Sequence, residues 1–189
     1  MIQDRTDITV AAIHGNAPRI HPSAFIASGC RIIGDVEIGP DVSIWYNCVI
    51  RADVNRIVIG ARTNVQDGSV IHCDSPKRSR PEGYATLIGE DVLIGHMAMV
   101  HGCVLEDRAF VGLGAIVMDG SHIESDAMLA AGAQLTGKRI PARQLWIGRP
   151  AKYLRDLDDA AIAANQAGVR GYVQNGRHHA QALGLNYGA

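Results

Sequence analysis

The chain has 189 residues, of which 47% are apolar and 20% are charged, and its formal net charge is −1. This balance is typical of a soluble globular protein. It argues against a nucleic acid or an anionic membrane surface as partner, because both select a basic excess. Only 5% of the residues are aromatic and 21 are Gly, so we expect a narrow, regular core built from Ile, Val, Leu and Ala.

The beginning of the chain and its cysteines bear on the cellular compartment. Arg5 and Asp7 stand where a secretory signal would have its apolar stretch, and the sequence has no run of about 18 uncharged apolar residues that could span a bilayer. We therefore expect a cytoplasmic protein. Its four cysteines show no CxxC spacing and should be free thiols in a reducing compartment, two of them (Cys30 and Cys48) in the core.

A strict period of six residues begins near residue 20. Six isoleucines follow one another at this interval: Ile20, Ile26, Ile32, Ile38, Ile44 and Ile50. Four positions after each of them stands a small or β-branched residue: Ala24, Cys30, Val36, Val42, Cys48 and Val54. Neither the helical period of 3.6 nor simple alternation produces a strict six. The pattern indicates one short strand and one turn per repeat, stacked as a solenoid.

The same period returns three times with a shifted phase. The later runs are Ile59, Val65 and Ile71, then Ile88, Ile94 and Val100, then Leu105, Val111, Val117, Ile123, Leu129 and Leu135. The sequence resembles the hexapeptide-repeat proteins, whose coils of about 18 residues contain three short strands and wind as a left-handed parallel β-helix. The period indicates the solenoid, and the resemblance alone implies its left hand. We predict a β-helix domain of about six coils over 20–140, after a lead-in segment at 1–19.

A polar segment at 73–85 interrupts the repeat and is predicted to be a loop ejected from the solenoid. His72 directly precedes this loop, and His101 follows Val100 in the next coil. The two histidines are 29 residues apart, which corresponds to one coil of about 18 residues plus an 11-residue insertion. They should therefore stack on adjacent coils about 4.8 Å apart, close enough for the two imidazoles to share one metal ion.

His96 stands two residues after Ile94 and so occupies a different position in its turn. Within one solenoid it is poorly placed to reach the other two histidines. A neighbouring subunit that presents its own His96 would complete the ligand set, and a three-fold assembly would contain three such sites. The remaining histidines are expected to be structural: His14, His21, His122, His178 and His179.

The six-residue pattern stops after Ile140. Residues 148–151 are typical of a turn, and 156–183 has apolar residues near helical spacing. We therefore predict that 141–189 forms a turn and a C-terminal α-helix that packs antiparallel along the solenoid. Three glycines within this helix each cost about 1 kcal/mol relative to Ala, so the helix needs a surface to lie on.

The polar residues around the loop form a specific set. Arg51 and Asp53 come first, then Asn64, Gln66 and Asp67, then the three histidines His72, His96 and His101. Over nearly the whole chain this set resembles the gamma-class carbonic anhydrase family. The resemblance implies a homotrimer with three metal ions, each bound by His72 and His101 of one subunit and His96 of the next.

The resemblance also implies roles for the other residues of the set. Gln66 and Asn64 would orient the metal-bound water or the substrate. Arg51 and Asp53 would bind across the subunit interface or position bicarbonate, while Asp67 would support the site, with Arg51 as one possible partner. Tyr172 matches a residue of the C-terminal helix that approaches the active site, and a packing role is the alternative for it.

Three neutral imidazoles and one water are the usual ligands of catalytic zinc. In carbonic anhydrases, the standard example of this effect, zinc lowers the pKa of its water to about 7 and so provides hydroxide that attacks carbon dioxide to give bicarbonate. Histidine ligands also suit iron and cobalt. Val54 stands where the best-characterised branch of the family has a Glu, and Glu82 is the only Glu of a basic loop. A proton-export route is therefore not evident from the sequence.

Three other functions fit parts of this pattern. The same metal centre would serve a hydrolase that acts on thioesters. A hexapeptide-repeat acyltransferase would use a histidine as general base without a metal. A catalytically silent binding or assembly subunit would need no proton export, which fits the missing shuttle residues.

Overall fold

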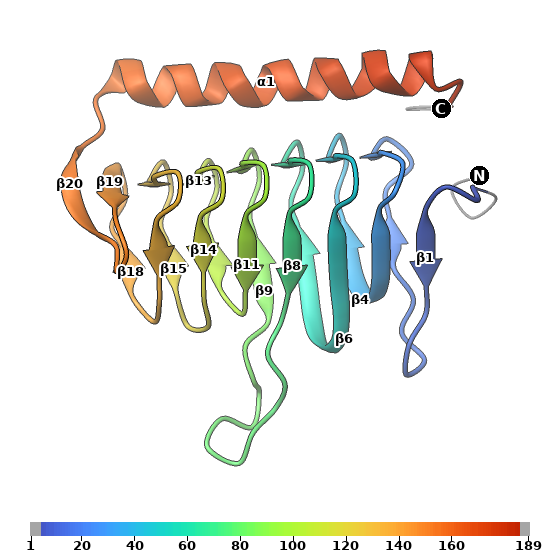
Figure 1. Cartoon of the computed structure of the whole chain (residues 1–189), viewed down its shortest axis with the longest axis horizontal. Coiled ribbons are helices and arrows are strands. Elements are labelled where there is room, and N and C mark those ends of the chain that lie inside the picture. The colour runs from blue at the N-terminus through green and yellow to red at the C-terminus, as the bar shows by residue number, and fades with distance from the viewer. Residues whose placement is uncertain (1–4, 186–189) are drawn as a thin grey trace.

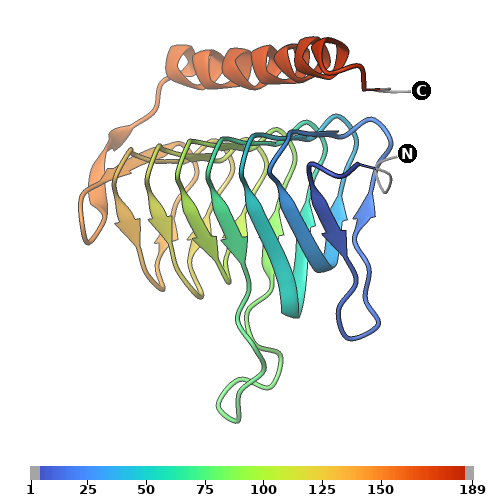
Figure 2. The same cartoon turned by 45° about the vertical axis from the view of Figure 1, so that its right-hand side comes forward.

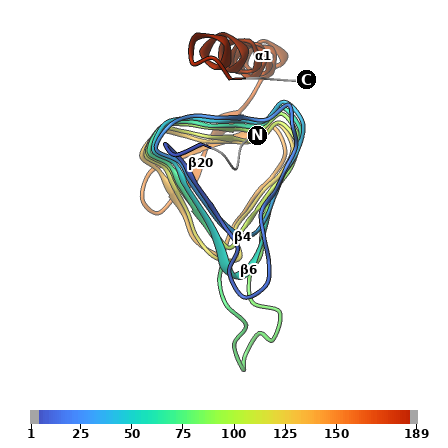
Figure 3. The same cartoon turned by 90° about the vertical axis from the view of Figure 1, so that its right-hand side faces the viewer.

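The computed structural model describes residues 5–185, so the outermost ends of the predicted segments 1–19 and 141–189 lie outside the described residues. Within this range the chain forms a solenoid of triangular cross-section, with the helix α1 (Asp159–Ala182) lying along one side (Figures 1 and 3). Within residues 5–185, no helix combines the length and the apolar character that a membrane span requires. The predicted fold class, a left-handed parallel β-helix of hexapeptide repeats with a C-terminal α-helix, is confirmed.

Three faces of short parallel strands make up the solenoid. The helix face, beneath α1, contains β3 (Phe25–Ile26), β5 (Ser43–Ile44), β7 (Asn64–Val65), β10 (Leu93–Ile94), β13 (Phe110–Val111), β16 (Met128–Leu129) and β19 (Gln144–Ile147). The histidine face contains β1 (Thr9–Ala11), β8 (Val70–His72), β11 (Met99–His101), β14 (Ile116–Val117) and β17 (Gln134–Leu135). The third face contains β2 (Arg19–Ile20), β9 (Thr86–Ile88), β12 (Val104–Leu105), β15 (His122–Ile123) and β18 (Arg139–Ile140).

Two long strands, β4 (Arg31–Ile38) and β6 (Val49–Ile59), pass from the histidine face to the third face without a break. They turn the corner of the triangle that lies opposite α1 (Figure 3). The loop 73–85 leaves the solenoid at this same corner, between β8 and β9 (Figure 1). The segment between the two strands comprises residues 73–85.

The core consists of the residues that the six-residue period selects. Every ladder residue from Ile26 to Leu135 is buried, and Ile20 at the first coil is partly buried. Cys30 and Cys48 are also fully buried, and all four cysteines are free thiols in the core. The aliphatic composition therefore follows from the stacking, because each coil of this narrow prism has room only for small and branched side chains.

Val54 differs from the other small or β-branched residues that follow the isoleucines by four positions, since 40% of it is exposed. Ala52 pairs with Gly34 and Ile57 pairs with Val36, so residues 53–56 have only Asp35 opposite them. The extra residues bulge outward at the corner between the two long strands. The six-residue register is therefore broken at Val54.

The solenoid is longer at both ends than predicted. The helix face contains seven stacked parallel strands, which means seven coils rather than six. The extra coil comes from β19, which lies beyond Ile140 and pairs with β16. At the other end β1, within the predicted lead-in segment, pairs in parallel with β4. These end coils lack an uninterrupted six-residue ladder, so the period alone could not include them.

The C-terminal helix begins three residues later than predicted. Residues 152–156 form β20 (Lys152–Asp156), which is antiparallel to β19 across the turn at 148–151. Asp158 then caps the helix, because its side chain accepts a hydrogen bond from the Ala161 amide at 2.8 Å. The helix runs back toward the N-terminal end of the solenoid (Figures 1 and 2) and contacts β3, β5, β7 and β10.

Two glycines of this segment give a matched test of helix propensity against backbone conformation. Gly171 is helical and Gly184 has a φ of +65°, and a Cβ added at either would meet no atom within 4 Å. Gly171→Ala is expected to raise the free energy of unfolding by about 1 kcal/mol. Gly184→Ala should lower it by about 1 kcal/mol, because only glycine adopts this left-handed C-terminal conformation readily. Denaturant unfolding measures both, and effects of the same sign would contradict this account.

Candidate metal centre

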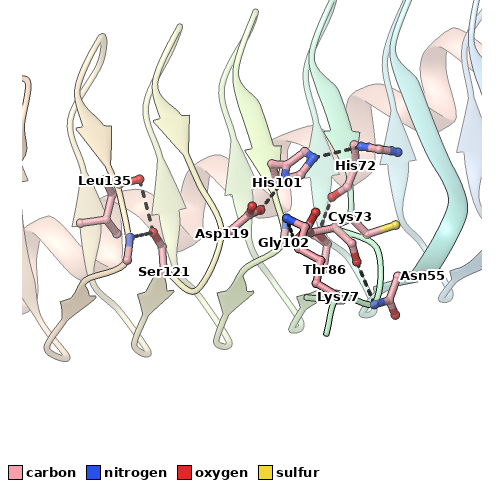
Figure 4. Close-up of polar contacts among 12 residues, drawn as sticks. Asn55, His72, Cys73, Lys77, Thr86, His101, Gly102, Asp119, Ser121 and Leu135 are labelled. Carbon is pink, nitrogen blue, oxygen red and sulfur yellow. Dashed lines mark hydrogen bonds and ion pairs between the residues drawn. The ribbon is translucent and has the colours of Figure 1, made fainter. Parts of the chain in front are cut away.

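His72 and His101 lie one above the other on the histidine face, as the register predicts. They are direct partners on the adjacent parallel strands β8 and β11. Their ring centroids are 5.0 Å apart, and His72 Nδ1 lies 3.0 Å from His101 Nε2 (Figure 4). Both side chains are mostly buried, at 18% and 22% exposure. The predicted stacking is confirmed.

Each imidazole of this pair has a carboxylate on its other nitrogen. His101 Nδ1 is hydrogen-bonded to Asp119 Oδ1 (Figure 4). On the other ring, His72 Nε2 lies 2.9 Å from Asp53 Oδ1. A carboxylate accepts hydrogen bonds, so each neutral imidazole places its N–H toward its own aspartate. The two nitrogens that face each other then both carry lone pairs. Such a contact is satisfied by a cation between them.

Arg51 and Asp53 form an ion pair within one chain. Burial alone would raise the pKa of Asp53, but the hydrogen bonds from His72, from its own backbone amide and from Arg51 outweigh burial and hold that pKa below its usual value. Asp53 is therefore the ionised partner of both His72 and Arg51. The predicted contact of Arg51 and Asp53 across a subunit interface stays a prediction.

Thr86, at the base of the loop, was not identified from the sequence. Its buried hydroxyl donates a hydrogen bond to the carbonyl oxygen of His72 and accepts one from the Gly102 amide at 2.9 Å (Figure 4). Asn55 holds the two ends of the loop together, because its Nδ2 donates hydrogen bonds to the carbonyl oxygens of Asp74 and Glu82. The ejected loop thus fixes the backbone at both histidines.

Asp119 was also missed. Val100 and Val117 are strand partners 17 residues apart, whereas Asp119 stands 18 residues after His101. It therefore lies in the next coil, one position beyond the residue in register with His101, and bonds to that imidazole from there. By contrast, Glu82, the one Glu of the loop, is exposed and pairs with Arg80 at 3.1 Å.

His96 lies in the turn between β10 and β11, at the other end of the histidine face from His101. Its Nδ1 lies 2.9 Å from Asp67 Oδ2, and 42% of the side chain is exposed. The prediction of a supporting role for Asp67 named Arg51 as a possible partner. In the chain, His96 is the partner of Asp67 instead, because residues 67 and 96 occupy the same turn position in adjacent coils.

Asn64 and Gln66 are buried on the helix face, next to Asp67 in the sequence. Gln66 Nε2 donates to Asn64 Oδ1 at 3.1 Å, while Asn64 Nδ2 has no hydrogen-bond partner among the described residues. A buried N–H without a partner costs about 1–3 kcal/mol, so this amide is a candidate donor to a ligand. The predicted role of both residues in orienting water or substrate remains untested.

Tyr172 connects α1 to this part of the molecule. Its ring packs edge-on against Trp45, with the centroids 5.6 Å apart. Burial and the nearby Asp67 carboxylate both raise the pKa of Tyr172, so the phenol is neutral and can donate a hydrogen bond. The packing role is present, and an active-site role stays a prediction.

The candidate residues therefore form two groups, one near the corner of the triangle opposite α1 and one on the side of the solenoid that faces α1. The pair group contains Arg51, Asp53, His72, His101 and Asp119, and the turn group contains Asn64, Gln66, Asp67, His96 and Tyr172. Among residues 5–185 of a single chain, no three His, Cys, Asp or Glu side chains are arranged to hold a metal ion. Joining the pair group to His96 requires a second copy of the chain.

Comparisons with known proteins agree with the repeat and with the polar set. The family model described as bacterial transferase hexapeptide (six repeats) matches residues 17–52. The chain is 39% identical to a protein of Geobacillus kaustophilus named carbonic anhydrase, over 87% of each chain. It is 40% identical to the mitochondrial gamma carbonic anhydrase 2 of Arabidopsis thaliana, over 91% of this chain.

The chain belongs to the gamma-class carbonic anhydrase family. It spans 62% of the length of the Arabidopsis relative, whose name places that relative in mitochondria, so the cytoplasmic location stays a prediction here. A solved Bacillus cereus structure described as a candidate acetyltransferase superposes with a TM-score of 0.88 at 35% identity, covering 94% of this chain and 99% of that one. Proteins similar to this chain are thus described both as carbonic anhydrases and as acetyltransferases.

The residues of the pair group fit the metal ion that the family name implies. Zinc accepts neutral imidazole nitrogens at about 2.0–2.1 Å, so two of its tetrahedral ligand atoms lie about 3.3–3.4 Å apart. The facing nitrogens of His72 and His101 are 3.0 Å apart, so a movement of a few tenths of an ångström accommodates the ion. The carboxylates behind both rings are the partners that metal-binding histidines usually have.

Proposed function

We propose that this chain is a metal-dependent carbonic anhydrase that converts carbon dioxide and water into bicarbonate and a proton. In this proposal the sites lie between the subunits of a homotrimer, each formed by the pair group of one subunit and the turn group of the next. The observation that carries the proposal is the His72–His101 pair, whose facing nitrogens both present lone pairs because Asp53 and Asp119 take the N–H groups.

In the proposed reaction, His72 and His101 of one subunit and His96 of the next would hold zinc, iron or cobalt, and such an ion would supply a nucleophilic hydroxide at neutral pH by lowering the pKa of water. Gln66 and the unpartnered amide of Asn64 donate hydrogen bonds to an oxygen of carbon dioxide or bicarbonate. The neutral phenol of Tyr172 is a further donor on the same side. Arg51 carries the positive charge that favours bicarbonate, and Asp53 holds the guanidinium in place.

The acyltransferase alternative is supported by the description of the Bacillus cereus structure and by the name of the family model. A general base needs a free lone pair directed at the acceptor group. The lone pairs of His72 and His101 are instead directed at each other, which favours a metal centre over a base. A thioester hydrolase would use the same centre, and a silent assembly subunit would bind metal without turnover.

Metal analysis with stopped-flow kinetics tests the proposed function. Protein purified without chelator should contain about one zinc, iron or cobalt ion per chain and should accelerate the hydration of carbon dioxide. Removing the metal with a chelator should abolish the activity, and restoring zinc or cobalt should recover it. A folded trimer that binds no added metal would overturn the proposal. Bound metal with activity only on acyl thioesters would support the hydrolase, and metal without either activity the assembly subunit.

A further inference from the structure

We infer that Asp119 is a positioning residue of the candidate metal centre, which holds His101 in the tautomer whose Nε2 lone pair faces His72. The inference rests on the proposed metal-binding function and extends it to a residue outside the polar set that resembles the family. Asp119 follows β14, one coil beyond His101, and its Oδ1 accepts the hydrogen bond from His101 Nδ1 (Figure 4).

The space that Asp119 uses is left by Gly102, the residue directly after His101. A Cβ added to Gly102 would lie 2.3 Å from Asp119 Oδ1 and 2.9 Å from the Cβ of Tyr84. Any other residue at position 102 would therefore push the carboxylate away from the imidazole. Gly102 is therefore suited to this position in two ways: it adopts a positive φ of 54°, and it leaves the space that the Asp119 carboxylate occupies.

The backbone around Asp119 is fixed independently of the histidine. Gly120 N donates to the carbonyl oxygen of Gly102 at 2.9 Å, which joins the two coils beside the hydrogen bond of the carboxylate. The ring of Tyr84, at the end of the ejected loop, lies close over Gly120, since an added Cβ there would be 3.1 Å from the ring. The carboxylate is thus directed at His101 by the fold, and orienting the imidazole requires no further ordering of the aspartate.

The two carboxylates behind the pair differ in what else they bind. Asp53 also pairs with Arg51, so part of its charge is neutralised. Lys77 is a nearby cation for Asp119, but its ammonium binds Asp74 at 2.7 Å. A partner that binds the second nitrogen of a histidine ligand fixes the ring and raises its basicity, and removing such a partner typically weakens metal binding 10- to 100-fold. We expect Asp119 to act in this way on His101.

Zinc affinity of the metal-free chain, measured by competition with a chelator, tests the inference without any turnover. Asp119→Asn is expected to weaken Zn²⁺ binding by about 10- to 100-fold. Two controls should change it by less than about 3-fold. Asp74→Asn removes an equal charge close to His101 without a hydrogen bond to it. Glu106→Gln removes the carboxylate that lies 2.7 Å from His122 Nε2. This histidine–carboxylate pair is not part of the candidate site.

A second measurement has a wild-type arm that does not depend on how the variants fold. Nitrogen-15 NMR of the metal-free wild-type chain should show His101 with its proton on Nδ1, and Asp119→Asn should shift the population toward the Nε2–H tautomer. An Nε2–H tautomer of His101 in the wild type would overturn the inference. So would equal zinc affinities for the wild type and Asp119→Asn. Failure of the wild type itself to bind Zn²⁺ is a different result, because it would overturn the proposed function.

Discussion

Two inactive variants are expected to restore each other's metal binding when they assemble in the same trimer. His96→Ala leaves the His72–His101 pair intact, and His101→Ala leaves His96 intact. In the proposed trimer, each variant alone would lack one of three ligands at every site, so its affinity for zinc should fall by at least about 100-fold, more than the loss of a mere supporting residue. A complete site forms again wherever the pair of the first variant faces His96 of the second.

The stoichiometry of this rescue follows from three-fold symmetry. In a closed ring of three, any mixture of the two variants contains one interface at which an intact pair meets an intact His96. Co-expression with two different affinity tags and purification on both should therefore give about one metal ion per three chains, against about one per chain in the wild type. The control is a trimer made only of His96→Ala chains, co-expressed with the two tags on separate copies. It should bind no metal. Mixed trimers without metal would contradict an intersubunit site.

The repeat explains why so much of this site was predictable. A strict period converts sequence separation into position, because residues one coil apart must stack. The 29-residue separation of His72 and His101 therefore predicted their contact across an 11-residue insertion, and the structure has them as strand partners 3.0 Å apart. The same rule predicted that His96 lies apart from the pair. His96 stands two residues after its ladder residue, whereas His72 and His101 each stand one residue after theirs. In few other folds can neighbouring side chains be inferred so directly from their separation in the sequence.

Predictions failed where the register was interrupted or where the period carries no information. The repeat does not show that Val54 is exposed, because residues 53–56 bulge at a corner between two long strands. The helix start was misplaced because apolar spacing continues through β20 (Lys152–Asp156), while the N-cap Asp158 determines where the helix begins. Asp119 was missed for another reason. It lies one position out of register with His101, and a lone carboxylate on a turn has no signature until the histidine next to it is known.

The stacking that makes the sequence readable also predicts where the fold tolerates no added atom. Gly112 follows the ladder residue Val111 at the end of β13, and its backbone lies directly against the next coil. A Cβ added there would be 2.3 Å from the Ala131 amide nitrogen and 2.6 Å from the Ala130 carbonyl carbon. Both are backbone atoms, so no side-chain rotation relieves the contact. Gly112→Ala should therefore separate the coils locally.

We expect Gly112→Ala to lower the free energy of unfolding by about 3 kcal/mol, at the upper end for an overpacked site, and the Tm by roughly 6–12 °C. The matched control is Gly114→Asn, two residues later. Gly114 has a φ of +62° but open space around it. At the same turn position in other coils Asn47 and Met97 adopt φ values of +60° and +59°, so this substitution should cost less than about 1 kcal/mol. Thermal unfolding followed by circular dichroism measures both. If Gly114→Asn were the more damaging of the two, backbone conformation rather than the spacing of the coils would limit which residues this solenoid accepts.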